Sequence, residues 1–380
     1  MSRVPDDAAT PARGDLLRRQ IVVDAIVPTI LLRAILLVFG LLAVIVLEAG
    51  SLPISGSILE IWNRWDAPHF FEVAQYGYGP PADPARIVLF PLLPALIRIG
   101  SLVTQPLYAG MAISFVGTLA AAAGLYRLVR MDENRPTARW AMLAMSVFPT
   151  AFTLVAPYSE GPFLAFTVWS FVAARERRWA AAGALGLLAG LTRIQGAFIL
   201  PALVVEYWLA QRRVGRDASW LLLVAGGPLI YLAINYLTFG DPLYFLGIQR
   251  DVFKVTTVAP WTALADGWNG VMLLQPSREW ATVYLAPFVA ICVLAATTLW
   301  TIFGRHGRPS YAVYTGLTLL SFLTLSWPIS VPRYLMGVFP IFMAMGVLGR
   351  KPSLGPPVFV ASVLLLGLST ALFVTGRWAF

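Results

Sequence analysis

The chain has 380 residues, of which 58% are hydrophobic and only 12% are charged. This composition excludes a soluble globular protein and indicates one that crosses a membrane several times. The net charge of +9 does not point to nucleic acid, because the arginines stand in small clusters between apolar runs, as in the loops of membrane proteins. A single cysteine, Cys292, and two histidines, His69 and His306, exclude a disulfide framework and a cysteine-rich or histidine-rich metal centre.

The N-terminal segment, residues 1–20, is polar and is predicted to be a disordered cytoplasmic tail. The apolar run over 26–47 is longer than a signal-peptide core and lacks an Ala-x-Ala exit, so we expect an uncleaved first span. Residues 21–380 are expected to form one transmembrane domain, because no polar segment is long enough to fold separately.

Further apolar runs are long enough, or nearly so, to cross a bilayer. They lie at 107–128, 140–157, 160–174, 179–192, 195–211, 218–238, 281–303, 310–326, 332–348 and 356–376. The run over 91–103 is shorter and carries Arg98, which favours an interfacial or re-entrant helix. The sequence therefore predicts an all-α bundle of about eleven transmembrane helices.

The basic residues predict the orientation of this bundle. With the N-terminus cytoplasmic, the external segments hold half as many basic residues as the cytoplasmic ones, in agreement with the positive-inside rule. This orientation places the loops 48–106 and 239–280 outside, together with the turns at 158–160 and 331–334. Since these segments hold most of the unusual polar residues, we expect the chemistry on the external face.

A polar island over 62–71 follows the first span and holds Asp66 and His69 among aromatic residues. A carboxylate inside the bilayer costs roughly 2.5–3.5 kcal/mol, so an acid this close to it is usually functional or firmly paired. Pro68 is favoured in the first turn of a helix, so a short helix is predicted to begin near Ala67. Two interpretations of Asp66 stay open: it satisfies the backbone donors of that helix, or it is a general base.

The neighbours of Asp66 also have alternative roles. His69 could share its helix face, or be a half-buried ring bonded to a loop carbonyl. Glu72 is expected to be solvated, and Phe70 to face the membrane. Arg64 is a candidate phosphate contact, although a cation at a membrane surface needs no such role.

Arg193 and Arg333 are single arginines at outer helix ends, where the positive-inside rule disfavours them. Because arginine binds phosphate through two parallel hydrogen bonds, such a pair would suit a lipid-phosphate donor. The alternative is that both reach for headgroup phosphates. Gln195 faces outward beside Arg193, and Gln249 and Arg250 could line a donor groove. The sequence has no Gly-rich phosphate loop and no metal-ligand spacing.

Three sequence blocks together carry a family resemblance. They are Trp65-Asp66-Ala67-Pro68-His69-Phe70-Phe71, Ala74-Gln75-Tyr76-Gly77-Tyr78 and Leu89-Phe90-Pro91-Leu92-Leu93-Pro94, and later landmarks are Pro157-Tyr158-Ser159-Glu160, Thr192-Arg193 with Gly196, and Pro332-Arg333-Tyr334. With these blocks, most of residues 60–340 resembles the PIG-V-like mannosyltransferases of the GT-C superfamily. The chain is shorter than the eukaryotic members and has only two lysines, which indicates a bacterial or archaeal plasma-membrane member.

The resemblance implies transfer of mannose from a polyprenyl-phosphate-mannose donor to a glycolipid or glycan acceptor outside the membrane, with inversion and without a metal or other cofactor. It implies that Asp66 is the base and that His69 positions substrate. Arg193 and Arg333 would then be phosphate contacts, and Tyr158, Glu160 and Tyr334 further substrate-binding residues. One prominent acid agrees with an inverting displacement.

Two alternatives remain. A lipid-sugar flippase or transporter would place ionisable residues within its spans, for which Glu206 and Arg33 are the clear candidates. A GT-C transferase with a different sugar or a protein acceptor is the other. The protein-O-mannosyl branch is less similar, because it has an Asp-Glu pair where this chain has Asp66-Ala67.

Overall fold

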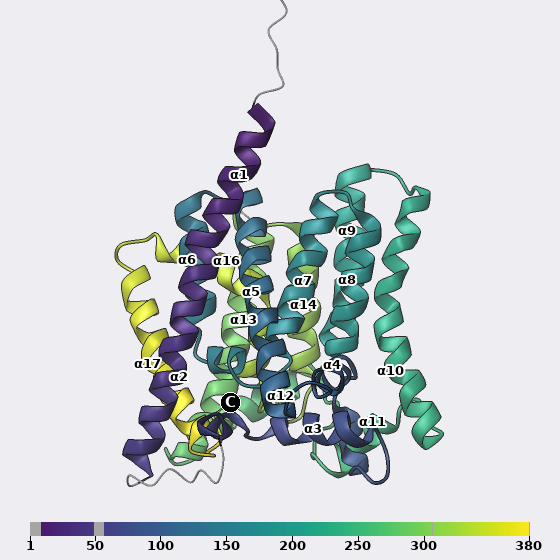
Figure 1. The fold of residues 1–380 in the computed structure, drawn as a ribbon, viewed down its shortest axis with the longest axis vertical. Coiled ribbons are helices and arrows are strands. Elements are labelled where there is room, and N and C mark those ends of the chain that lie inside the picture. Colours follow the sequence, from purple (N-terminus) through teal and green to yellow (C-terminus); the bar gives the residue numbers. More distant parts are fainter. Residues whose placement is uncertain (1–8, 49–56, 306, 380) are drawn as a thin grey trace, which may run out of the picture.

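The computed structural model describes residues 9–48, 57–305 and 307–379. Within these ranges the protein is an all-α bundle whose long helices run side by side (Figure 1). The helices of the bundle are α2 (Val27–Leu47), α5 (Pro106–Asp132), α6 (Arg135–Val147), α7 (Glu160–Arg175), α8 (Trp179–Thr192), α9 (Ile199–Gln211), α10 (Leu223–Phe239), α13 (Ala286–Phe303), α14 (Pro309–Leu323), α16 (Phe339–Gly349) and α17 (Gly355–Val374). The other α-helices are α1 (Ala9–Ile21), α3 (Asp66–Tyr76), α4 (Leu92–Gly100), α11 (Tyr244–Asp251), α12 (Pro260–Leu273) and α15 (Val331–Tyr334).

Short 3-10 or π segments connect or extend these helices. They are η1 (Val22–Ile26), η2 (Ile58–Trp62), η3 (Pro84–Val88), η4 (Ala151–Leu154), η5 (Ile194–Phe198), η6 (Arg216–Leu222), η7 (Trp280–Leu285) and η8 (Leu335–Gly337). In the described ranges the only β-type pairing is an isolated bridge between Thr257 and Leu325.

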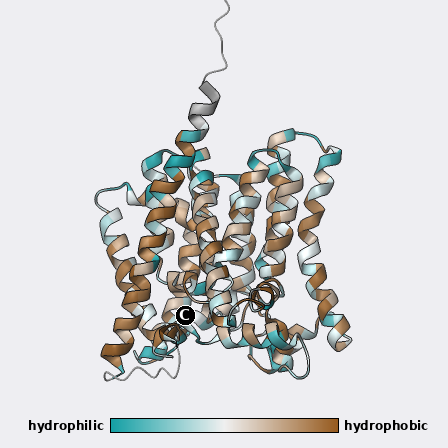
Figure 2. Ribbon diagram, viewed as in Figure 1, coloured by the Kyte–Doolittle hydropathy of each residue, from teal (hydrophilic) through white to brown (hydrophobic). Residues whose placement is uncertain are grey.

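The bundle has the length and composition of a membrane-spanning protein. Among the described residues, six helical stretches are long and apolar enough to cross a bilayer: Gly14–Leu47, Pro106–Asp132, Ile194–Gln211, Arg216–Phe239, Trp280–Phe303 and Gly355–Val374. The segments Val331–Gly337 and Phe339–Gly349 form a seventh candidate that is bent by 83°. Apolar residues fill the middle of the bundle and polar residues gather at its two ends (Figure 2). The protein is therefore an integral membrane protein.

Every predicted span coincides at least partly with a helix, but several of these helices are short. α6, α7, α8 and α14 have 13, 16, 14 and 15 residues, fewer than the roughly 20 that cross a bilayer without help from neighbours. The count of eleven transmembrane helices therefore stays a prediction.

Two local predictions are corrected. From Ala9 onward the predicted disordered tail is helical and continues through η1 into α2, while residues 1–8 lie outside the described ranges. The predicted span over 140–157 is interrupted after Val147. Phe148 is extended there (φ −56°, ψ 143°) because it precedes Pro149, which disfavours a helical conformation.

The segments predicted to be external gather at one end of the bundle, opposite to α1 (Figure 1). This end, called the α3 end below, holds α3, α4, α11 and the C-terminal segment. The Tyr231 hydroxyl, from α10, donates to the carbonyl of Ile87 over 2.8 Å and so ties the first loop to the bundle. α4 has nine residues and is too short to cross, in agreement with the interfacial or re-entrant prediction.

One face of α3 packs against protein rather than lipid. Phe70 and Ala74, one helical turn apart, form a buried cluster with Leu93 and Ile97 of α4. The expectation that Phe70 faces the membrane is therefore wrong, because α4 covers that side. This contact holds α3 firmly across the α3 end.

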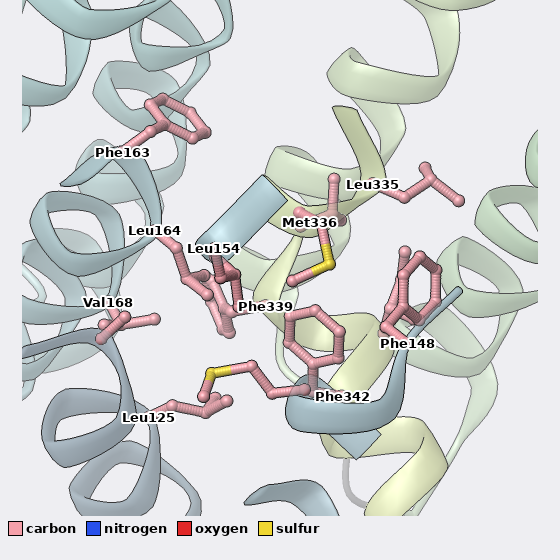
Figure 3. Packing of buried hydrophobic residues seen from close by; sticks show 14 of the residues in the cluster. Leu125, Phe148, Leu154, Phe163, Leu164, Val168, Leu335, Met336, Phe339 and Phe342 are labelled. Atoms are coloured by element: carbon pink, nitrogen blue, oxygen red, sulfur yellow. The ribbon is translucent and has the colours of Figure 1, made fainter. Parts of the chain in front are cut away.

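Part of the main core surrounds the break between α15 and α16. Phe339 and Phe342 pack there with Leu154 of η4, and Leu335 and Met336 lie beside them (Figure 3). All five side chains are almost fully buried. Since Leu335 follows directly after α15, this packing fixes the position of the α15 segment.

α5 and α7 cross closely at two glycines. A Cβ atom on Gly161 would lie 2.6 Å from the Ser114 carbonyl oxygen, and one on Gly117 would lie 2.5 Å from the Pro162 nitrogen. Only glycine permits this approach of two backbones. Because Gly161 follows Glu160, the crossing sets how deep the Glu160 carboxylate lies.

Candidate active site

Asp66 begins α3, directly after a residue in an unfavourable backbone conformation. Trp65 has φ 55° and ψ −107°, a region that a bulky residue adopts only when its surroundings hold it there. The Trp65 ring packs edge-on against Trp378, with 5.0 Å between ring centroids. The Tyr158 hydroxyl accepts from the Asp66 amide over 3.2 Å and donates to the Arg64 carbonyl over 3.0 Å. These contacts fix where Asp66 lies.

The Asp66 carboxylate is paired with Arg333. Nη1 of Arg333, in α15, donates to Oδ2 of Asp66 over 2.5 Å. This carboxylate is thus bound to a distant arginine, in contrast to the helix-capping interpretation.

Glu160, at the start of α7, links two arginines. Its Oε1 accepts from Nη1 of Arg193 over 2.6 Å and lies 3.2 Å from Nε of Arg333. Nη1 of Arg193 also donates to the Ser159 hydroxyl over 3.2 Å. Asp66, Glu160, Arg193 and Arg333, which come from four separate parts of the chain, are called the Asp66–Arg333 cluster below.

The two guanidinium groups pack over the faces of aromatic rings. The Arg193 guanidinium lies 4.4 Å from the centroid of the Tyr334 ring, and that of Arg333 lies 5.1 Å from the same ring. Arg333 is also 5.2 Å from the Tyr158 ring. Such contacts attract a cation while leaving its N–H groups free to point at anions.

Burial differs sharply within the cluster. The side chains of Glu160, Arg333 and Arg193 are 1%, 7% and 11% exposed, whereas that of Asp66 is 32% exposed. Asp66 is therefore the member that an incoming molecule meets first. Oε2 of Glu160 is buried without a hydrogen-bond partner among the described residues, so this carboxylate keeps unused acceptor capacity inside the cluster.

A second group of charged side chains acts on His69. Glu72 pairs with Nε of Arg86 over 2.7 Å and accepts from the Asp83 amide over 2.8 Å, so this carboxylate is ion-paired while 26% of its side chain is exposed. Burial lowers the pKa of His69, and Arg86 acts in the same direction, against Asp66, Glu72 and Asp83. His69 is therefore a neutral ring at pH 7.

Other candidates lie outside the cluster. Arg64 points toward the Val374 carbonyl, 3.4 Å away. Arg250 is exposed and pairs with its neighbour Asp251 over 2.7 Å. Gln195, Gln249 and Arg250 are not among the four residues that form the Asp66–Arg333 cluster. The sequence did not predict the contact of Trp378 with Trp65, because nothing in the residues around Trp378 indicates which ring it meets.

The two ionisable residues that a transporter would use are engaged in structural contacts. Arg33, inside α2, donates to the backbone carbonyls of Ser146 and Ala151. Glu206 of α9 is buried and paired with Arg308. Within the described ranges, no group of three or more His, Cys, Asp or Glu side chains is arranged to hold a metal ion.

No protein-family model and no curated protein sequence match the chain. Among solved structures, ArnT from Cupriavidus metallidurans bound to undecaprenyl phosphate is 14% identical with a TM-score of 0.48, over 92% of this chain and 76% of that one. The oligosaccharyltransferase of Archaeoglobus fulgidus with a tethered acceptor peptide is 11% identical with a TM-score of 0.44, over 92% of this chain and 55% of that one. Both TM-scores lie below 0.5.

Proposed function

We propose that the chain is a membrane-embedded glycosyltransferase that moves a sugar from a polyprenyl-phosphate donor to an acceptor hydroxyl. The observation that carries this proposal is the Asp66–Arg333 cluster, a partly exposed carboxylate beside buried Arg333 and largely buried Arg193 at one end of an apolar bundle. A carboxylate can accept the proton of a hydroxyl, and guanidinium groups can bind a departing phosphate. This combination serves group transfer from a lipid phosphate.

In the proposed reaction the acceptor oxygen attacks the anomeric carbon of the donor sugar. The bond from that carbon to the phosphate oxygen breaks, and its electron pair leaves with the polyprenyl phosphate. The hydroxyl proton passes to Asp66. Arg193 and Arg333 balance the charge that develops on the phosphate, and neutral His69 positions the acceptor. A single displacement of this kind inverts the anomeric configuration.

The finer assignment rests on the sequence resemblance. Mannose as the sugar, a glycolipid or glycan as the acceptor, and a metal-free reaction follow from the PIG-V-like blocks around Asp66 and Arg333. The distribution of basic residues supports an external active site and a cytoplasmic N-terminus. The short chain with only two lysines supports a bacterial or archaeal plasma membrane.

The test uses the purified protein in lipid nanodiscs with labelled polyprenyl-phosphate-mannose and a glycolipid acceptor. We expect wild type to release polyprenyl phosphate with and without EDTA, and Asp66→Asn to lower that rate by about a thousandfold or more. Glu176→Gln is the matched control, because Glu176 pairs with Arg127 over 2.5 Å at the opposite end and its side chain is 23% exposed.

Near-normal turnover by Asp66→Asn would overturn the proposal. Movement of the donor across a proteoliposome membrane without release of phosphate would instead identify a flippase. Release from polyprenyl-phosphate-glucose but not from the mannose donor would keep the enzyme and change its sugar.

A further inference from the structure

The geometry of the cluster raises a conflict between its two proposed tasks. Oδ2 of Asp66 accepts from Arg333 over 2.5 Å. The proposed base, Asp66, is therefore bound to the arginine that is proposed to bind the donor phosphate. One of the two Asp66 carboxylate oxygens, Oδ2, is directed at this guanidinium, and a carboxylate paired with an arginine is a weaker base than a free one. The group that would hold the phosphate already holds an anion.

Asp66 is more exposed to solvent than its partner Arg333. Arg333 is 7% exposed and is backed on its Nε side by buried Glu160, whereas Asp66, on its Nη1 side, is 32% exposed. A carboxylate and a phosphate ester both offer oxygens that a guanidinium binds in the same way. The Asp66 carboxylate therefore stands where an oxygen of an incoming phosphate would stand.

The charges of the cluster agree with an exchange. Two arginines and two acids balance while Asp66 is paired. When Asp66 leaves, Arg193, Arg333 and Glu160 together carry one positive charge, which complements the single negative charge of a phosphodiester donor. Glu160 is too deeply buried to leave with it, and it keeps both arginines in place.

We infer, on the basis of the proposed function, that Asp66 occupies the anion position of Arg333 until the donor phosphate exchanges with it. The exchange releases the carboxylate, which then faces the acceptor hydroxyl as the base. Acceptor activation is thus conditional on a bound donor. Glu160 is a positioning residue that aligns both arginines in either state.

The test is the affinity of the protein in nanodiscs for undecaprenyl phosphate, which carries the phosphate but no sugar. If Asp66 competes for Arg333, Asp66→Asn and Asp66→Ala bind this lipid at least about tenfold more tightly than wild type, whereas Glu176→Gln binds it as wild type does. In an Arg333→Gln background, Asp66→Asn does not increase the affinity for undecaprenyl phosphate, because the arginine for which Asp66 and the phosphate compete is absent.

The outcomes separate the inference from the proposed function. Equal or weaker binding by both Asp66 variants, in a protein whose wild type transfers sugar, overturns the exchange and leaves the enzyme standing. Failure of wild type both to bind undecaprenyl phosphate and to release it from a donor overturns the proposed function itself. Because Asn has the shape of Asp and the position is one-third exposed, Asp66→Asn keeps the fold, which its unfolding temperature checks.

Discussion

Arg333 donates a hydrogen bond to Asp66 over 2.5 Å although 267 positions separate the two residues in the sequence. The pair joins the first helix of the α3 end to a segment near the C-terminus. Arg193 and Glu160, from the middle of the chain, complete the same cluster. The site therefore exists only when the whole bundle is assembled.

Arg333→Gln is expected to lower both activity and stability. It leaves buried Glu160 with one arginine fewer, and breaking a buried ion pair costs about 3–5 kcal/mol. Arg127→Gln, which removes a pair whose arginine is 36% exposed, should cost about 1 kcal/mol or less. Thermal unfolding of the two variants in one detergent measures the difference. Equal shifts would show that the cluster is not buried as described.

Tyr158→Phe is expected to reduce turnover more than stability alone explains. It removes the hydroxyl that links the Arg64 carbonyl to the Asp66 amide, at a cost of roughly 1–3 kcal/mol. Tyr126→Phe is the matched control, because the Tyr126 hydroxyl bonds to Asp24 over 2.8 Å at the other end. Both variants should melt earlier, and only Tyr158→Phe should lose kcat. A similar kcat for Tyr158→Phe and Tyr126→Phe would contradict the proposal that Tyr158 positions Asp66.

Gly161→Ala is expected to destabilise the crossing of α5 and α7. The added Cβ would lie 2.6 Å from the Ser114 carbonyl, and such overpacking typically costs about 1–3 kcal/mol. Gly316→Ala in α14 is the control, since its Cβ would meet nothing closer than 3.9 Å. Unfolding temperatures should fall for the first variant and hold or rise for the second. The reverse order would contradict the described contact.

His69 makes stability depend on pH in a defined window. Its pKa is lowered by burial and by Arg86, so the folded protein binds the proton less strongly than the unfolded chain, whose histidine titrates near about 6.5. Stability should therefore fall as the pH drops below about 6.5 toward the lowered pKa, and not change through His69 above it. Between about pH 7.5 and 5.5, the unfolding temperature should fall by more for wild type than for His69→Gln. Identical slopes would rule out this contribution.

What the sequence predicts well is local. The helix near Ala67 follows from the preference of proline for a first turn, and α3 indeed begins at Asp66. The gathering of distant loops at one end follows from span order, because successive crossings alternate direction.

What the sequence does not predict is which charge meets which. Arg193 and Arg333 are visible as arginines in unusual places, but their shared partner Glu160 depends on how closely α5 and α7 cross. Glu72 looks solvated until Arg86 of η3 folds back onto it. These pairings arise from packing between elements, which no periodicity along the chain encodes.

The equal numbers of arginines and acids in the Asp66–Arg333 cluster affect how a donor is captured. These four charges, taken by themselves, cancel and project little field beyond the contact distance, so they do not draw in a distant anion. Donor lipids then arrive by lateral diffusion within the leaflet, and the capture rate should change little between dilute and concentrated salt.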